Sequence, residues 1–208
     1  MTPGPTGQIN RANKPIVARF PGHMIHLDVK KVGRILPGGG WRAHGRGTPK
    51  AKASKRGKAA RIGYTYLHTA IDGFSRPAYT EALDDEKAST TIGLFCRARA
   101  FLAAHGVTRL VRVVTDNGAN YRAQTFTTTI TSLASRHQRI RPRTPRHNGK
   151  AERCNRILAE ERLYARTYSS KQQHRDAVAV WSHHYNYHRP HTACHNQPPA
   201  PQHTSPTS

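Results

Sequence analysis

The stretch LVRVVTDNGANY, residues 110–121, decides the fold of this chain. It begins with a short run of branched apolar residues, which is typical of a strand buried inside a sheet. Asp116 follows this run directly, and the next two residues, Asn117 and Gly118, are a strong turn signal. The stretch therefore predicts a buried strand that ends on a carboxylate. In open α/β sheets, the ligand crevice lies beyond such strand ends.

The segments around this strand predict a mixed α/β sheet. Runs of branched and aromatic residues indicate strands, and apolar residues at spacings of three and four indicate helices. The predicted strands are residues 23–29, 62–71, 76–83, 110–115 and 138–141. The predicted helices are residues 86–105, 126–134, 151–168 and 171–187. Three consecutive strands followed by strands that alternate with helices predict a five-stranded α/β fold flanked by helices.

Three acidic residues stand where such a sheet presents its ligands. Asp28 is predicted to close the first strand, and Asp116 closes the strand at 110–115. Glu152, in TPRHNGKAERCNR (144–156), lies in the first turn of a helix. Three carboxylates without Cys or His among them favour hard cations such as Mg²⁺ or Mn²⁺. Two such ions about 3.5–4 Å apart suit the in-line displacement of a phosphoryl group.

The charge of the chain favours a polyanionic partner, and nucleic acid is the first candidate. Its 208 residues include 34 Lys and Arg against 11 Asp and Glu, which gives a formal net charge of +23. Residues 66–135 are nearly neutral, whereas residues 1–65 and 136–208 carry almost all of the excess. This distribution predicts a folded middle that meets its ligand through both basic flanks.

Several other classes of protein are excluded by the composition. Three cysteines and no CxxC pair rule out a disulfide framework and a zinc finger, and they favour a reducing compartment. No apolar run approaches the roughly 20 residues that cross a bilayer, and Met1 is not followed by the apolar segment of a signal peptide. We therefore expect a cytoplasmic, nucleoid-associated protein with no membrane partner.

Composition also predicts the organisation of the chain. Residues 1–20 and 199–208 are rich in Pro, Gly, Ser and Thr and are expected to be disordered. A core is expected over 21–168, with a basic, Gly-rich insertion at 31–61 that is predicted to be a long loop. A C-terminal helix and the segment YNYHRPH (185–191) occupy 169–198.

Five motifs resemble, in the same order, the catalytic core shared by retroviral-type integrases and bacterial insertion-sequence transposases. They are HLDV (26–29), IDGFSR (71–76), TDNG (115–118), NGKAER (148–153) and YNYHRPH. That family is marked by two Asp and a Glu with 35 residues before the Glu, and 35 residues separate Asp116 from Glu152. The resemblance covers about residues 20–198.

The resemblance implies an RNase H-like fold and a metal-dependent polynucleotidyl transferase. Asp28, Asp116 and Glu152 would be the catalytic residues and the ligands of two Mg²⁺ or Mn²⁺ ions. Water would first cut a phosphodiester at the end of a mobile element, and the freed 3′-hydroxyl would then attack target DNA. The implied partners are the element ends, the target DNA and further copies of the chain bound to DNA.

Basic residues near these motifs are the predicted DNA contacts. They are Arg146, Lys150, Arg153 and Arg156, with the run Lys50, Lys52, Lys55, Arg56 and Lys58 in the insertion. Asn155 and Arg156 share a helix face with Glu152, so either DNA contact or ordinary surface polarity explains them. YNYHRPH is interpreted as a structural lock or a contact to the DNA backbone. Asp72 in IDGFSR is predicted to serve the turn rather than catalysis.

Two alternatives remain open at this point. A nuclease of the same fold would cut DNA without joining it. The second alternative is a catalytically idle DNA-binding remnant. It is suggested by the expectation that the short segment before Asp28 lacks the helix-turn-helix region that usually precedes such a core. Metal-dependent joining of pre-cut ends distinguishes the first alternative, and salt-dependent binding without nicking distinguishes the second.

Overall fold

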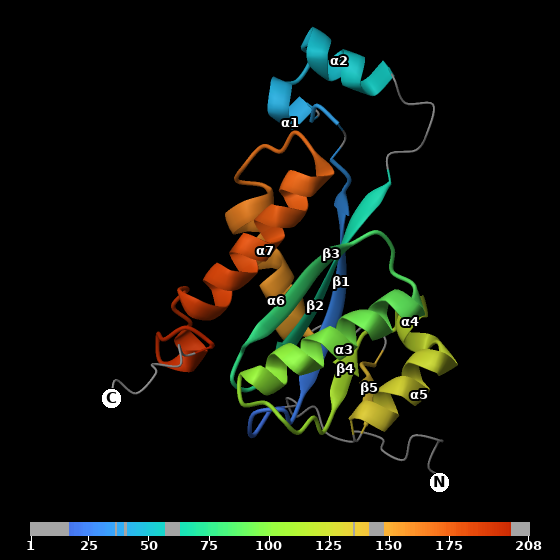
Figure 1. The fold of residues 1–208 in the computed structure, drawn as a ribbon, viewed down its shortest axis with the longest axis vertical. Coiled ribbons are helices and arrows are strands. Elements are labelled where there is room, and N and C mark those ends of the chain that lie inside the picture. The colour runs from blue at the N-terminus through green and yellow to red at the C-terminus, as the bar shows by residue number, and fades with distance from the viewer. Residues whose placement is uncertain are drawn as a thin grey trace.

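Five strands form one mixed sheet in the order β3-β2-β1-β4-β5 (Figure 1). The computed structural model describes residues 17–35, 37–39, 41–56, 63–134, 136–141 and 148–200. The strands are β1 (Ile25–Gly33), β2 (Tyr64–Asp72), β3 (Ala78–Leu83), β4 (Val113–Thr115) and β5 (His137–Arg139). The first three are antiparallel neighbours, whereas β4 and β5 run parallel to β1. The predicted mixed five-stranded sheet is confirmed.

Helices cover both faces of this sheet (Figure 1). One face carries α3 (Ala88–Ala104), α4 (Ala119–Arg122) and α5 (Gln124–Leu133), and the other carries α6 (Gly149–Leu158) and α7 (Lys171–Tyr187). A π-helical turn, Ala159–Leu163, extends α6, and a 3₁₀ turn, Thr192–Cys194, follows α7. The helices predicted from apolar spacing are all present, although the helix predicted over 151–168 is divided.

The alternation of side chains along the strands builds two cores. Ile25 and Leu27 of β1 pack against Phe95 of α3 in the first core. Leu67 and Ile71 of β2 face the opposite way and pack in the second core with α6 and α7. Because successive side chains of a strand point to opposite faces, the residues that alternate with Ile25 and Leu27 on β1 point to the face that α6 covers. Asp28 is one of them, because it follows Leu27.

The position of Asp28 differs from the sequence prediction. β1 does not end near Asp28 but continues to Gly33, and it pairs with β2 along this whole length. Its pairing with β4 is much shorter and covers only Ile25 and His26. Asp28 therefore lies two residues beyond the point where the pairing of β1 with its parallel neighbour β4 stops, and not at the end of its own strand.

The insertion at 31–61 is also not the long loop that its composition predicts. Its first residues complete β1, and two helices follow, α1 (Trp41–His44) and α2 (Pro49–Arg56). The Thr48 hydroxyl caps α2 by accepting a hydrogen bond from the Ala51 N–H (3.2 Å), and Pro49 suits the first helical position. The two helices project from the end of the sheet (Figure 1).

The segment YNYHRPH binds α7 to the edge of the sheet. Asn186 is buried, and its amide both accepts from the Ala78 N–H (2.9 Å) and donates to the Ala78 carbonyl (2.8 Å). Arg189 pairs with Glu161 of the π-helical turn (2.8 Å). These contacts support the structural-lock interpretation of Asn186 and Arg189.

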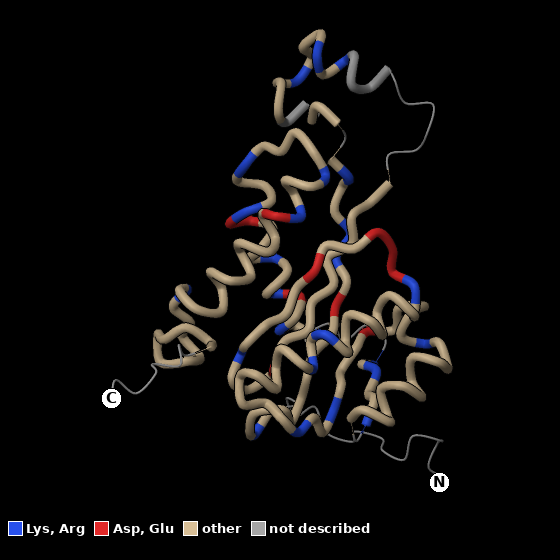
Figure 2. Tube along the Cα trace, in the orientation of Figure 1, with Lys and Arg blue, Asp and Glu red and all other residues tan. Residues whose placement is uncertain are grey.

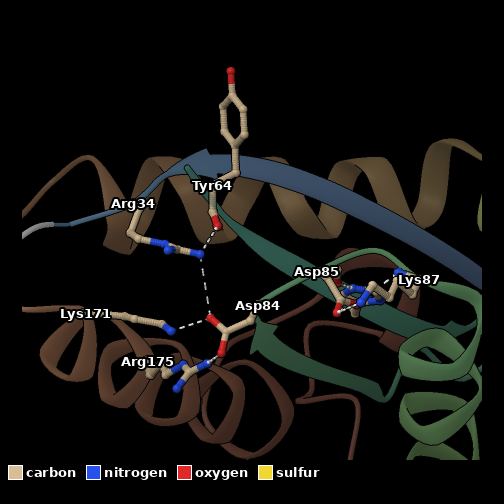
Figure 3. Close-up of polar contacts among 8 residues, drawn as sticks. Arg34, Tyr64, Asp84, Asp85, Lys87, Lys171 and Arg175 are labelled. Carbon is tan, nitrogen blue, oxygen red and sulfur yellow. Dashed lines mark hydrogen bonds and ion pairs between the residues drawn. The ribbon is translucent and has the colours of Figure 1, made fainter. Parts of the chain in front are cut away.

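The remaining acids near these motifs have structural partners. Asp72 is buried in the β2–β3 turn, where its carboxylate accepts from the N–H groups of Gly22, Phe74 and Ser75 (2.6–3.1 Å), which confirms the predicted turn role. Asp84 lies among three cations in Figure 3: it pairs with Arg175 (2.9 Å), Lys171 and Arg34 (4.0 Å). Asp84 thereby links the end of β3 to the start of α7.

Candidate active site

The three predicted acids come from three neighbouring elements. Asp28 lies on β1, Asp116 directly follows β4, and Glu152 lies in the first turn of α6. Asn148 positions α6 because its buried amide donates to the Leu27 carbonyl (2.9 Å), next to Asp28. The Asp116 carboxylate accepts from the Gly118 N–H (2.8 Å). A Cβ at position 118 would lie 3.1 Å from this carboxylate and 2.7 Å from the Asn120 side chain, so any other residue here would displace one of these side chains.

A cleft of about 500 Å³ lies between β1 and α6. The residues that line it are Asp28, Val29, Lys30, Gly149, Glu152, Arg153, Asn155 and Arg156. Asp28 and Glu152 thus face the same cleft, whereas Asp116 lies outside its lining. Three cationic side chains surround the two carboxylates, which is the arrangement that a phosphodiester backbone near a metal site requires.

A buried polar network fixes the Asp28 carboxylate. The Asn155 amide donates to Asp28 Oδ2 (2.8 Å), and its own carbonyl oxygen accepts from the Thr69 hydroxyl (2.6 Å). Thr69 also contacts the Thr80 hydroxyl (3.0 Å). Asn155 is only 1% exposed. Asn155, one of the predicted DNA contacts, is therefore hydrogen-bonded to Asp28 inside the protein.

The three carboxylates influence one another electrostatically. Burial raises the pKa of Asp28 to about 6; the Asn155 hydrogen bond lowers it, and the charges of Asp116 and Glu152 raise it. Burial and the charge of Asp116 also raise the pKa of Glu152. Each carboxylate therefore lies within the field of the others. A nearby cation would relieve this repulsion.

The donor set fits a pair of hard divalent cations, although the side chains are not preassembled around one. Within the described part of the chain, no three His, Cys, Asp or Glu side chains are placed to hold a metal ion together. The oxygen-only donors and their mutual repulsion are nevertheless what Mg²⁺ or Mn²⁺ prefers.

The raised pKa of Asp28 predicts how the stability of the metal-free protein depends on pH. Because the folded state holds this proton more tightly than the unfolded chain, deprotonation favours unfolding. Its destabilising effect appears as the pH rises through about 4 to about 6 and stays constant above. Asp28→Asn should therefore stabilise the metal-free protein by about 3 kcal/mol at neutral pH and by only about 0.5 kcal/mol near pH 4.

Urea unfolding of both proteins with a chelator present measures this effect. The difference between the two proteins isolates Asp28, because His26 and His137 have pKa values lowered to about 4 by burial and act in the opposite direction in both. An equal difference at the two pH values would contradict the burial of a charged Asp28.

The predicted DNA contacts are distributed over two regions. Arg153 and Arg156 are exposed at the cleft, and Lys150 is partly buried at the start of α6. Lys50 and Lys52 are exposed on α2, far from the cleft, at one end of the molecule (Figure 1). Lys55 and Arg56 belong to α2, but the structure describes only their backbone; Arg146 and Lys58 lie outside the described residues. Figure 2 shows Lys and Arg spread over the whole length of the molecule, whereas most Asp and Glu lie near its middle.

Sequence patterns miss the residues that support the acids. Thr69 and Thr80 belong to no recognised catalytic pattern, and Asn148 belongs to NGKAER but was given no role there. The two threonines can be found only once the strands are paired. Thr69 then lies directly opposite Asp28 in the β1–β2 ladder, and Thr80 lies opposite Thr69 in the β2–β3 ladder. The register of the sheet, rather than the sequence, assembles this network.

Comparison with known families gives two matches that together cover most of the chain. The family described as "Integrase core domain" matches residues 19–145, and a second family with the same description matches residues 133–199. In the described part of the chain, no helix is long and apolar enough to span a membrane.

Two curated proteins are similar in sequence. The "Insertion element IS476 uncharacterized 39.2 kDa protein" of Xanthomonas euvesicatoria is 32% identical over 133 residues, which are 64% of this chain and 37% of that protein. The "Retrovirus-related Pol polyprotein from transposon TNT 1-94" of Nicotiana tabacum is 32% identical over 99 residues, which are 48% of this chain and 7% of that protein. The chain thus spans little more than a third of the Xanthomonas protein and a small part of the Nicotiana polyprotein.

Solved integrase structures share the fold. A chain of the simian T-cell lymphotropic virus intasome, solved with PP2A regulatory subunit B56 gamma, superimposes with a TM-score of 0.66 at 24% identity, over 93% of this chain and 58% of that one. The HTLV-2 integrase catalytic core domain in complex with magnesium has a TM-score of 0.57 at 17% identity, over 88% and 96%. The predicted RNase H-like architecture is confirmed by these likenesses.

Proposed function

The chain belongs to the integrase core domain family, and on this premise we propose that it is the catalytic core of a DNA transposase or integrase. It cuts and joins phosphodiester bonds of mobile-element DNA with two divalent ions. The observation that carries the proposal is that Asp28 and Glu152 face one cleft lined by Lys and Arg, and that the charge of Asp116, just outside this lining, acts on both of them. A protein that only binds DNA has no need for carboxylates gathered beside a basic cleft.

Asp28, Asp116 and Glu152 are the residues that would hold Mg²⁺ or Mn²⁺. When bound, the two ions would lower the pKa of the attacking hydroxyl and stabilise charge on the leaving oxygen. Asn155 keeps Asp28 in one orientation through its hydrogen bond. Arg153 and Arg156 hold the backbone phosphates on either side of the scissile bond, so that the attacking oxygen and the phosphorus are aligned.

The reaction has two steps that use the same site. Water attacks the phosphorus at the element end, the bond from phosphorus to the 3′-oxygen breaks, and this oxygen takes up a proton of the water to become a 3′-hydroxyl. This 3′-hydroxyl then attacks a phosphodiester of the target strand; the bond from that phosphorus to the target's own 3′-oxygen breaks, and the proton of the attacking hydroxyl passes through solvent to this leaving oxygen. No covalent bond to the protein forms, and copies of the chain would assemble on the DNA to bring two ends together.

The proposed core comprises residues 21–168, with the α1–α2 insertion as a basic arm and residues 169–198 as its C-terminal support. Lys50 and Lys52 on this arm are exposed and would contact backbone phosphates away from the cleft. Lys55, Arg56 and Lys58 of the same run, and Arg146 before α6, complete the proposed set of DNA contacts.

Two reactions of the full chain test the proposal. One follows nicking of supercoiled plasmid in Mg²⁺ or Mn²⁺, and the other follows joining of a labelled oligonucleotide with a free 3′-hydroxyl into that plasmid. We expect both products with either ion and neither with a chelator. Nicking without joining would identify a nuclease, and strongly salt-dependent binding without either product would identify an idle DNA-binding protein.

A further inference from the structure

Three motifs outside the catalytic carboxylates meet at one place in the fold. They are the β2–β3 turn that contains IDGFSR, the start of α6, and the segment after α7. The turn contacts the last of these through Ala78, which bonds to Asn186, and through the Ser75 carbonyl, which accepts from Cys194 Sγ (3.5 Å). The start of α6 is held beside the turn because Asn148 bonds to Leu27 of β1.

Cations outnumber acids at this junction, where Glu152 lies between two of them on α6 and faces the catalytic cleft. Arg76 comes from the turn, and Lys150 and Arg153 come from the first turns of α6. Burial lowers the pKa of His191, and the nearby charges of Arg76, Arg153 and Lys150 lower it further. All three cations therefore lie close to this histidine. Within the described residues, none of these three cations forms an ion pair.

The acids nearest to the junction are already engaged. The Asp72 carboxylate accepts several hydrogen bonds inside the turn. Glu161 is paired with Arg189, the fourth cation of this region. The positive charge of Arg76, Lys150 and Arg153 is therefore left for a partner outside the chain.

Arg76 is held by the fold in an unusual conformation. Its φ of +75° lies in the left-handed region that favours glycine. The turn imposes this conformation through the bond from the Asp72 N–H to the Pro77 carbonyl (3.1 Å) and that from the Ser75 N–H to Asp72 (2.6 Å). A strained backbone in a turn over-determined by hydrogen bonds points to a functional demand on the side chain.

Arg76 contains a buried polar atom that lacks a partner within the described chain: its Nε has no acceptor. His26, which is 2% exposed, lies against the same turn, since a Cβ on Gly73 would be 3.1 Å from its Nε2. Burial lowers the pKa of His26 to about 4, and a hydrogen bond with the Asn148 side chain raises it. A buried guanidinium N–H without an acceptor is uncommon in folded proteins, and an acceptor from outside the chain would satisfy it.

We propose that Arg76, Lys150 and Arg153 form a second phosphate-binding surface, the turn site, which holds the DNA backbone beside the catalytic cleft. Arg153 also lines that cleft, so a strand that leaves the cleft continues over Lys150 to Arg76. The inference rests on the proposed function only in taking DNA as the polyanion. It gives IDGFSR and YNYHRPH a shared purpose: the second motif braces the turn from which Arg76 projects.

Salt-dependent binding of a fluorescein-labelled duplex, followed by anisotropy in the presence of a chelator, tests the turn site. The variant Arg76→Gln/Lys150→Gln is compared with a control that removes the same charge, Arg99→Gln/Arg122→Gln. Both control residues are exposed on the opposite face of the sheet, on α3 and α4. Each lost phosphate contact lowers the slope of log affinity against log salt by about 0.9, so we expect a decrease of about 2 for the test variant and none for the control.

A second pair guards against misfolding of the strained turn. Lys150→Gln/Arg153→Gln changes only α6 and should lower the slope by a similar amount, with thermal unfolding checked for every variant. Slopes equal to that of the control in both pairs would overturn the turn site. Because no divalent ion is present, the result is independent of catalysis: a lowered slope without any nicking activity would refute only the proposed function.

Discussion

Asp116→Asn is expected to lose metal-dependent nicking and joining of DNA by roughly a thousandfold or more. The substitution preserves the shape of the side chain and the hydrogen bond from the Gly118 N–H, so the fold should remain intact. It removes a negative charge that acts on both Asp28 and Glu152. Without it the site loses one anionic ligand and much of its attraction for a divalent cation.

The measurement is the initial rate of plasmid nicking in Mn²⁺, with DNA binding followed in parallel. Asp176→Asn is a matched control because Asp176 is an exposed acid on α7, hydrogen-bonded only to Gln172 among the described residues. The control should retain its rate, and both variants should bind DNA as the native chain does. Full activity of Asp116→Asn would show that the carboxylate assignment is wrong.

Asn155→Ala is expected to lower the nicking rate by about 10- to 100-fold, the usual effect of removing a group that orients a metal ligand. Asn155 is a positioning residue, since it acts through Asp28. Its hydrogen bond lowers the pKa of Asp28, and the substitution therefore raises that pKa. The deficit should be larger near pH 6 than near pH 8, because more Asp28 is protonated at the lower pH. A higher Mn²⁺ concentration should restore part of the rate.

Asn186→Ala separates this effect from a loss of stability. Asn186 is another buried asparagine, and its amide bonds to the Ala78 backbone, away from the carboxylates. Both substitutions leave buried groups unpartnered and should destabilise the fold by about 1–3 kcal/mol. Only Asn155→Ala should change the pH and Mn²⁺ dependence of the rate. The same shift in both variants would reduce Asn155 to a structural role.

Local sequence patterns predicted the elements that carry the acids because each has a strong local cause. The branched apolar run before Asp116 and the Asn117-Gly118 turn specify a strand end. The Gly149 turn and the apolar spacing after it specify the start of α6. These signals act over a few residues and need no knowledge of distant contacts.

The rest depended on pairing between distant segments. Asp28 was expected at a strand end, but its position is set by where β4 leaves β1, and that is a property of the sheet. Asn155 was expected on a polar helix face shared with Glu152 and Arg156, yet its own side chain is buried against Asp28 and Thr69. The helix α2 was hidden by its basic composition, and only the Thr48-Pro49 pair at its start signals it.

The central claim is that Asp28, Asp116 and Glu152 together hold divalent ions. Crystals of the protein grown with Mn²⁺ test it most directly, because the anomalous scattering of Mn²⁺ locates the ion without reference to any assumed site. We predict anomalous peaks bridging Asp28, Asp116 and Glu152 at the mouth of the cleft, and no such peaks for Asp116→Asn at the same Mn²⁺ concentration. Well-diffracting crystals with Mn²⁺ bound only elsewhere, or with these three carboxylates apart and free of metal, would contradict the account.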